Sequence, residues 1–318
     1  HRVGSFKNHI LELKILNQNK KISTCSNKKN KKLFNYTCGG MGLTGVILSC
    51  KFKLIPIETS YILQETRKTE NLDETFKLFY DNASSEYAVG WIDSSSKKIG
   101  RSVFFTGKHL KKKELNTNNK KNFLNVKKNI PLKIPFFFPR WMLNRYTIKI
   151  LNTLYYHFNS AEKKVIHYDK FFYPLDFIKK WNLVYGKDGF ICYQCVFPLK
   201  KSKMAIKKIL FLMHKHRIYS FLSIIKLLGK NDGSISFGIK GFTIAFDFPK
   251  SKKYEIFLKD MDKVVERCKG KIYLTKDSRI SKKNLRKIDK KFSNFTKSKI
   301  RKNSKTIFNS LQSKDRKS

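Results

Sequence analysis

The residues best suited to chemistry form a glycine-rich run near the start of the chain. The run Cys38-Gly39-Gly40-Met41-Gly42-Leu43-Thr44-Gly45-Val46-Ile47 holds four glycines within seven positions. Glycine lets a backbone approach a ligand closely and adopt positive φ, and successive N–H groups in such a turn can face an anion such as a pyrophosphate. Because the spacing matches neither the Rossmann nor the Walker pattern, the run predicts either a phosphate-binding loop or a tight turn between strands.

Two lysines are candidates for binding an anion, one within an apolar stretch and one beside other charged residues. Lys226 interrupts the apolar stretch 224–228. An unpaired buried ammonium is costly, so Lys226 must reach an anion or water, or else extend along a strand edge into solvent. Lys276 is followed by Asp277 and Arg279. We expect it at the end of a strand, where these two neighbours can orient it; the alternative is a surface lysine paired with Asp277.

The six cysteines do not form a recognisable metal or disulfide pattern. Cys192 and Cys195 have CxxC spacing, but positions i and i+3 of a strand point to opposite faces. No second pair completes a zinc site, and nothing indicates a disulfide framework. The sequence predicts reduced, buried thiols and no metal centre.

The charge of the chain admits a reading of another class, a basic nucleic-acid-binding protein. The formal net charge is +46 over 318 residues, but 58 of the 69 basic residues are lysine. Arginine, which planar phosphate recognition favours, is scarce, and the lysines are spread along the chain. We therefore expect no nucleic-acid partner, although an anionic lipid surface or a phosphorylated substrate would be attracted. No uncharged apolar run approaches the roughly 20 residues of a membrane span.

Strands and helices alternate without a dinucleotide-binding turn, which favours an α+β fold over a doubly wound sheet. Hydrophobic periodicity predicts a polar turn at 17–32 and a loop at 108–133. It predicts strands at 8–16, 44–57, 87–92, 102–106, 189–198, 221–228, 242–248 and 271–275. It predicts helices at 72–80, after Trp141 to about 157, at 203–214 and at 254–268, the last ended by Gly270.

Three phenylalanines lie between two prolines in the segment 134–141. A loop that packs into the core is one interpretation of this segment. The other is a lipid-facing lid, because exposed aromatic side chains beside lysine suit a membrane interface.

Several blocks of the sequence resemble, in order, those of FAD-dependent oxidoreductases of the vanillyl-alcohol-oxidase type. The glycine run with its apolar exit is one of them. The others cover nearly the whole chain: His1–Phe6 with Asn8-His9, Phe172–Asp176, Trp181-Asn182, Tyr185-Gly186, Gly189-Phe190, Tyr193-Gln194, Tyr219–Leu222, Lys226-Leu227, Asp247–Pro249 and Tyr273–Arg279.

The resemblance implies a split FAD-binding domain with an inserted substrate domain. Residues 1–57 and the returning segment 271–318 would belong to the FAD domain, and 58–270 to an antiparallel sheet with helices on one side. Because the chain starts partway into a block, we expect it to be a fragment that is truncated at its N-terminus. Such a fragment would lack the first flavin-binding loops and would bind FAD weakly or not at all.

The resemblance also implies the site residues. Lys276 would be the catalytic residue beside flavin and substrate. Substrate-side positions depart from the family pattern at Phe172, Cys192, Thr243 and Ala245, and no histidine matches a general base. Gly39, Gly40, Gly42, Thr44, Gly45, Ile47 and Tyr273 would bind FAD, and Lys226, Gln194, Phe172 and Trp91 would bind the substrate.

The implied activity is oxidation of a secondary hydroxyl of a sugar, linked to a polyprenyl phosphate, to a ketone. An aldonolactone or sugar-alcohol oxidase on the same flavin fold is the alternative within enzymes. The implied partners are the lipid-linked sugar, a reductase that completes an epimerisation, and a peripheral membrane contact. The implied location is the cytoplasm or the inner membrane surface of a bacterium.

Overall fold

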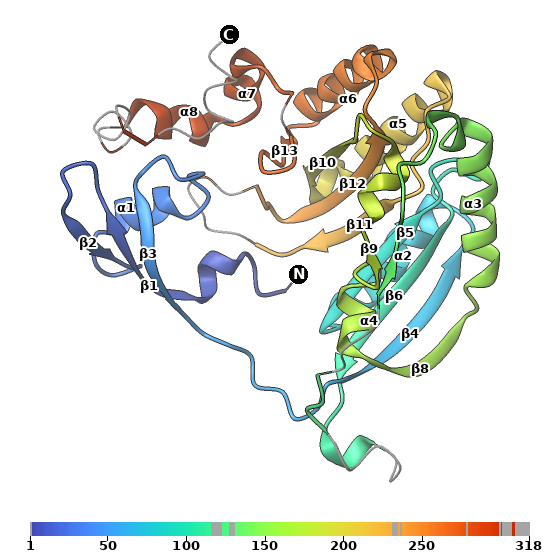
Figure 1. Cartoon of the computed structure of the whole chain (residues 1–318), viewed down its shortest axis with the longest axis horizontal. Coiled ribbons are helices and arrows are strands. Elements are labelled where there is room, and N and C mark those ends of the chain that lie inside the picture. The colour runs from blue at the N-terminus through green and yellow to red at the C-terminus, as the bar shows by residue number, and fades with distance from the viewer. Residues whose placement is uncertain are drawn as a thin grey trace.

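The structure is a computed structural model that describes residues 2–115, 123–126, 131–230, 235, 237–277, 279–298, 300 and 307–308. Figure 1 shows a small sheet with its own helix beside a much larger, helix-covered sheet. The extended segment after the small sheet leads into the first strand of the large one (Figure 1). The fold is α+β with a large antiparallel sheet, as the sequence predicted.

The small sheet has the order β2-β1-β3, with β1 Ile10–Leu16, β2 Ile22–Cys25 and β3 Val46–Phe52. Both pairings are antiparallel, and α1 (Lys31–Thr37) packs its buried Phe34 against Leu13 and Ile15. The prediction of a polar turn across 17–32 was wrong, because β2 and the start of α1 lie there. Periodicity misses β2, since this short edge strand buries only Cys25.

The large sheet has the order β13-β10-β12-β11-β5-β6-β4-β8, and every pairing in it is antiparallel. A separate parallel pair joins β7 (Leu132–Lys133) and β9 (Ile178–Lys179). The strands of the large sheet are β4 Tyr61–Thr69, β5 Tyr87–Ile92, β6 Ser102–His109, β8 Glu162–His167, β10 Phe190–Pro198, β11 Ser223–Leu228, β12 Gly241–Pro249 and β13 Lys271–Ile272.

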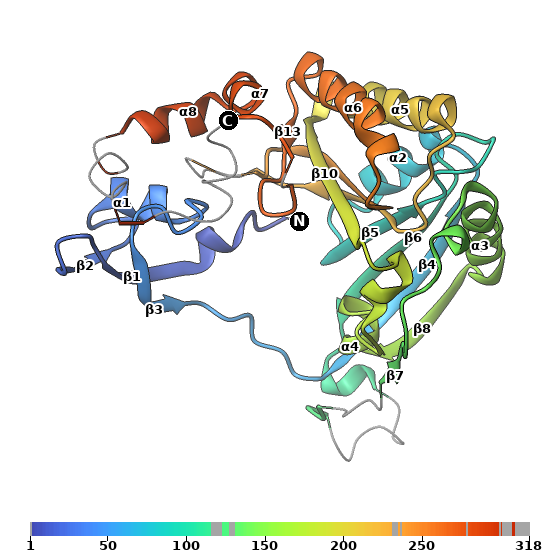
Figure 2. The same ribbon diagram turned by 45° about the horizontal axis from the view of Figure 1, so that its top comes forward.

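Helices cover both faces of the large sheet, whereas one covered side was expected. On one face, α2 (Leu72–Asp81), α5 (Leu199–His216) and α6 (Glu255–Arg267) enclose the main core; Figure 2 shows them together. On the other face, α3 (Arg145–Phe158) packs against β5 and β6, and α4 (Tyr168–Phe172) contacts β4. No helix in the described part of the chain has both the length and the apolar character needed to cross a bilayer.

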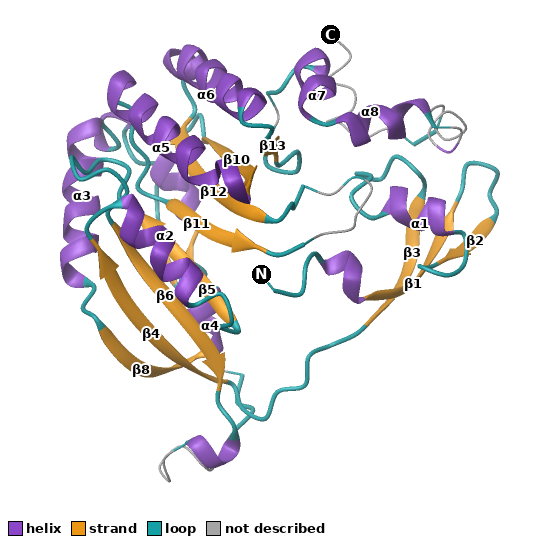
Figure 3. Cartoon of the chain, turned by 180° about the vertical axis from the view of Figure 1, so that it is seen from behind, coloured by secondary structure: helices purple, strands orange, loops and turns teal. Residues whose placement is uncertain are grey.

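The C-terminal part of the chain returns to the small sheet. Helices α7 (Lys282–Ile288) and α8 (Lys290–Lys297) lie on the side of α1 in Figure 3. Phe295 of α8 is fully buried, and its ring lies 5.1 Å from that of Tyr36 in α1. The two ends of the described chain therefore share a small core with Leu43 of the glycine run.

Two predicted boundaries near residue 270 were wrong. Lys269, with φ +56°, adopts the left-handed conformation after α6. Gly270 is required for a different reason, since a Cβ there would lie 2.7 Å from the carbonyl oxygen of Val196. The strand expected at 271–275 ends at Ile272, and a turn follows. Of the loop expected at 108–133, residues 116–122 and 127–130 lie outside the described residues. The described part includes the end of β6, η2 (Lys112–Glu114) and β7.

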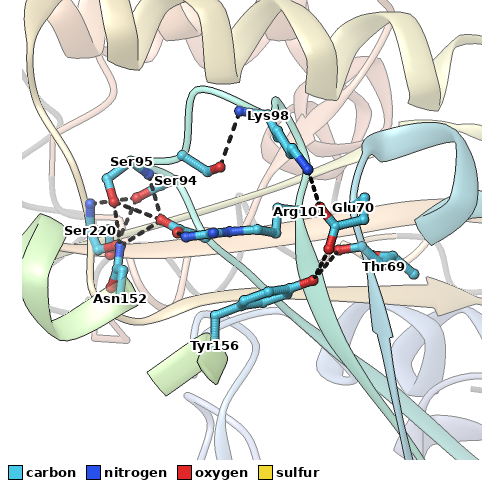
Figure 4. A network of polar contacts seen from close by, with 11 residues as sticks. Thr69, Glu70, Ser94, Ser95, Lys98, Arg101, Asn152, Tyr156 and Ser220 are labelled. Carbon is cyan, nitrogen blue, oxygen red and sulfur yellow. Dashed lines mark hydrogen bonds and ion pairs between the residues drawn. The ribbon is translucent and has the colours of Figure 1, made fainter. Parts of the chain in front are cut away.

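A polar network fixes α3 to residues at the ends of strands β4, β5 and β6 (Figure 4). The buried carboxylate of Asp93 pairs with Arg101 at 2.5 Å and accepts a hydrogen bond from Asn152 of α3 at 3.2 Å. Tyr156, one turn further along α3, donates its hydroxyl to Glu70 at 2.7 Å. Because Asp93 is paired and hydrogen-bonded, its burial is tolerated, and α3 is held by polar as well as apolar contacts.

Replacing Tyr156 with phenylalanine should lower the free energy of unfolding by about 1 kcal/mol, because the ring packing stays and the hydrogen bond to Glu70 is lost. Tyr173→Phe is the control, since Tyr173 is 53% exposed. Urea denaturation of both variants measures the effect. Equal stability of the two variants would show that the network does not hold α3.

Candidate active site

A cavity of about 810 Å³ lies between the small sheet and the part of the large sheet formed by β10, β11, β12 and β13. Its volume falls within the roughly 300–1,000 Å³ of ligand and cofactor pockets. Both units contribute to it: Phe6, Lys7, Leu13, Gly39, Ile47 and Cys50 line one side, and Gln194, Lys226, Thr243, Tyr273 and Thr275 line the other.

The glycine run connects α1 to β3, and four of its members, Cys38, Gly39, Met41 and Ile47, border the cavity. Gly39 has φ +90°, and a Cβ there would lie 2.4 Å from the carbonyl oxygen of Ile235. Gly40 and Gly45 also approach backbone atoms of the protein itself, whereas Gly42 (φ +74°) faces open space. Close packing therefore explains three of the glycines, while Gly39 and Met41 line the cavity.

Thr44 and Ile47 have different environments. Thr44 is buried and its hydroxyl lies 2.9 Å from that of Thr37, so it braces the loop. Ile47 is 50% exposed on β3 and lines the cavity. Of these two residues, only Ile47 has a surface available to a ligand.

Lys226 and Gln194 project from the face of the large sheet that lines the cavity. Lys226 pairs in register with Thr243 on the neighbouring strand, and Gln194 donates to the Thr243 hydroxyl at 3.1 Å. The surrounding protein and the nearby charge of Lys276 lower the pKa of Lys226. Lys226 is exposed and lines the cavity, where its side chain can reach water or an anion; its role there stays a prediction.

Lys276 lies in a tight turn rather than at a strand end. The turn is closed by the amide of Lys276, which donates to the Tyr273 carbonyl at 3.0 Å. Asp277 and Arg279 bind elsewhere: Asp277 accepts from the amide of Ile280 at 2.7 Å, and Arg279 makes a forked pair with Asp262. These neighbours therefore hold the turn itself, and the Lys276 side chain is directed to other partners.

The Lys276 side chain lies within electrostatic range of Cys192 and Asp247. These two residues lie directly opposite each other on β10 and β12, and both Asp247 and Lys276 lie close enough to the Cys192 thiol to influence its pKa. Burial and the Asp247 carboxylate raise the pKa of Cys192 to about 12. Burial also raises the pKa of Asp247, although Cys192 and Lys276 act against it.

Tyr185 completes this group from η5 (Trp181–Tyr185). It is 4% exposed, its hydroxyl has no hydrogen-bond partner among the residues that the structure describes, and it lies within electrostatic range of Asp247 and Cys192. Sequence reasoning assigned no role to Tyr185 or Asp247. A lone acid in the apolar strand 242–248 was the available signal, of the same kind as Lys226, but only the strand register brings Asp247 to Cys192.

Slow alkylation of Cys192 would report this arrangement. A pKa raised from 9.0 to about 12 reduces the thiolate fraction, and a higher intrinsic nucleophilicity offsets part of that loss. We expect Cys192 to react with iodoacetamide on the order of tenfold more slowly than the exposed Cys50. Peptide mass mapping measures both rates. Asp247→Asn should accelerate Cys192; no change would contradict the contact.

The six thiols are free, but only Cys25, Cys195 and Cys268 are buried as expected. Cys195 lies in the main core and Cys192 on the opposite face, as the spacing predicted.

Two expected substrate residues lie outside the cavity lining. Trp91 is 4% exposed, donates to the carbonyl of Phe221 at 2.9 Å, and packs its ring 4.5 Å from Tyr155 of α3. Phe172 lies in α4, with its ring 4.8 Å from Tyr87. The cavity thus brings together Gly39, Ile47, Gln194, Lys226 and Tyr273, with Lys276 next to the lining residue Thr275.

Comparison with known proteins gives a relative along most of the chain. Over 286 residues, 88% of this chain, it is 32% identical to decaprenylphosphoryl-β-D-ribose oxidase of Mycolicibacterium smegmatis, of which it spans 62%. It is also 21% identical over 292 residues to an uncharacterized protein of the mprA 5′ region of Streptomyces coelicolor, covering 78% of that protein. No protein-family model matches the chain. The chain is therefore a relative of decaprenylphosphoryl-β-D-ribose oxidase, which confirms the resemblance found in its sequence blocks.

Proposed function

We propose that this chain carries the substrate side, and part of the flavin side, of an FAD-dependent oxidoreductase. Its reaction would oxidise a secondary hydroxyl of a polyprenyl-phosphate-linked sugar to a ketone. The observation that carries the proposal is the meeting of Lys226, Gln194 and Tyr273 with the glycine run around one cavity. The name of the relative, an oxidase of a decaprenyl-phosphate-linked ribose, supports the substrate class.

The residues of the cavity fit a flavin on its small-sheet side. Gly39 and Ile47 would contact FAD through the loop and β3, and Tyr273 would contact it from the opposite side. The packing of Phe295 near Tyr36 supports assigning residues 1–57 and 271–318 to one domain. When bound, FAD supplies a two-electron acceptor for the hydride of the alcohol carbon.

Two lysines lie in mutual electrostatic range at this cavity. The charge of Lys276 contributes to the lowered pKa of Lys226, so the pair costs free energy unless an anion lies nearby. We assign Lys226 to the substrate phosphate and Lys276 to the negative charge that develops during alcohol oxidation. A positioned cation at a developing charge stabilises the transition state.

Asp247 is the proposed acceptor of the hydroxyl proton. Asp247 lies within electrostatic range of Lys276, which follows the lining residue Thr275, and this ties the carboxylate to the site. Burial also raises the pKa of Asp247, which brings the carboxylate closer to the range in which a general base is effective near neutral pH. The alcohol then loses its hydride from carbon and its proton to an Asp247 oxygen. Cys192, with its pKa near 12, stays a neutral thiol and orients the carboxylate.

An aldonolactone or sugar-alcohol oxidase remains the second candidate. The observation in its favour is that the departures from the family pattern gather on the substrate side, where Cys192 and Thr243 adjoin Gln194. In either case a ketone product calls for a reductase if the overall reaction is an epimerisation. We place the enzyme in the cytoplasm or at the inner membrane surface.

Anaerobic incubation of the FAD-supplied chain with a short-chain polyprenylphosphoryl ribose tests the proposal. We expect loss of oxidised-flavin absorbance and a product lighter by two hydrogens on mass spectrometry. A flavin that stays oxidised with this substrate but is bleached by an aldonolactone would favour the second candidate. Flavin fluorescence first establishes that FAD is bound to the chain, and a bound flavin that neither compound reduces would contradict both.

A further inference from the structure

Helix α3 carries large apolar side chains on its solvent-facing half as well as on the half that packs against the sheet. Ile148, Asn152 and Tyr156 face the sheet and are buried. The opposite half exposes large apolar side chains, and the exposed Trp141 precedes the helix. We call this the α3 surface: Trp141 (72% exposed), Tyr146 (62%), Ile150 (59%), Leu151 (46%), Leu154 (45%) and Phe158 (81%).

The stretch of chain around the α3 surface is strictly basic. Residues 115–161 contain eight lysines and arginines and no aspartate or glutamate. Arg145 and Lys149 are exposed on α3 itself, beside the apolar half of the helix. Exposed aromatic and aliphatic side chains with flanking cations are typical of helices that lie in the interface of an anionic bilayer.

We propose that the α3 surface docks this protein on an anionic lipid bilayer. The apolar side chains would enter the boundary between headgroups and acyl chains, while Arg145 and Lys149 would contact lipid phosphates. This inference stands on the exposed helix and its charge, and does not depend on the proposed activity.

A second copy of the chain fits the α3 surface less well. A two-fold dimer brings the same patch of each subunit together. Two copies of α3, each with exposed Arg145 and Lys149 and no acidic residue, would then face each other with like charge, which is unfavourable at close range. A bilayer that contains anionic lipid instead offers the complementary charge.

The segment before α3 is tied to η5, because the amide of Phe138 donates to the carbonyl of Leu183 at 3.0 Å. Phe136 and Phe137 of that segment are 60% and 46% exposed. The segment with the three phenylalanines therefore connects the α3 surface to η5, whose Tyr185 lies within electrostatic range of Asp247.

Vesicle flotation of the full chain tests the proposal. We expect binding to vesicles that contain phosphatidylglycerol, weaker binding to phosphatidylcholine alone, and loss of binding as salt is raised. The double variant Leu154→Ser/Phe158→Ser should reduce the partition coefficient by about tenfold or more. The matched control is Phe211→Ser/Ile256→Ser, whose two sites on α5 and α6 are 52% and 69% exposed; it should bind as the wild type does.

Trp141 provides a readout that needs no destabilising change. Its fluorescence should shift to the blue and be quenched by brominated lipid in anionic vesicles, and Trp141→Phe should remove that signal while Trp91 and Trp181 remain. The proposal is overturned if the double variant and the control bind vesicles equally, or if Trp141 is not quenched. It is also overturned if light scattering shows a dimer that only the α3 double variant dissociates.

Discussion

Replacing Lys276 with alanine is expected to slow flavin reduction by the sugar substrate about a hundredfold, while the fold stays intact. The loss of one electrostatic donor at a developing charge typically costs on the order of 3 kcal/mol. The turn that carries Lys276 is held by other residues, since Asp277 and Arg279 bind Ile280 and Asp262. Stopped-flow absorbance of the FAD-loaded protein measures the rate, and circular dichroism checks the fold.

Lys259→Ala is the matched control for Lys276→Ala, because Lys259 is an exposed lysine of α6. It should reduce its flavin at the wild-type rate. Lys276→Arg should recover only part of the rate, since a guanidinium keeps the charge but differs in shape. If Lys276→Ala reduces flavin as fast as Lys259→Ala, the role assigned to Lys276 is wrong.

Replacing Lys226 with methionine should raise KM between about tenfold and a hundredfold and change kcat much less. A hydrogen bond to a charged group contributes about 1.5–3 kcal/mol, and Lys226 would bind the substrate phosphate equally in ground and transition states. Loss of such uniform binding raises KM. Initial rates across a series of substrate concentrations separate the two constants, and flavin content should not change.

A substrate without its phosphate gives the control for Lys226→Met. Wild type and variant should then have similar KM values, because the lost contact is absent from both. If the variant instead discriminates against the phosphate-free sugar as strongly as the wild type does, the phosphate is bound elsewhere. Loss of FAD from the variant would make Lys226 a structural residue.

Local chemistry made several parts of the site predictable from sequence. A lysine in an apolar strand predicted that Lys226 reaches an anion or water, because burial of an unpaired ammonium is costly, and the structure has Lys226 among the residues that line the cavity. Strand alternation placed Cys192 and Cys195 on opposite faces. The ordered blocks carried the resemblance that the similarity to the oxidase confirms.

Long-range geometry was not predictable in this way. The contact of Cys192 with Asp247 depends on the register of β10 and β12, to which residues distant in sequence contribute. Asp277 and Arg279 were expected to orient Lys276. Arg279 instead binds Asp262 of α6, a residue that is distant in the sequence. Similarly, α3 covers the second face of the sheet because Asn152 and Tyr156 find partners there, which periodicity alone does not reveal.

Protection of Cys50 by FAD tests most directly the central claim that the cavity is the flavin site. Cys50 is an exposed thiol of β3 that lines the cavity. Its alkylation rate in the wild-type chain would be measured by peptide mass mapping at rising FAD concentrations, with flavin fluorescence recording occupancy. The account predicts that alkylation of Cys50 slows in proportion to bound FAD. Alkylation that proceeds at an unchanged rate while FAD is bound would contradict it.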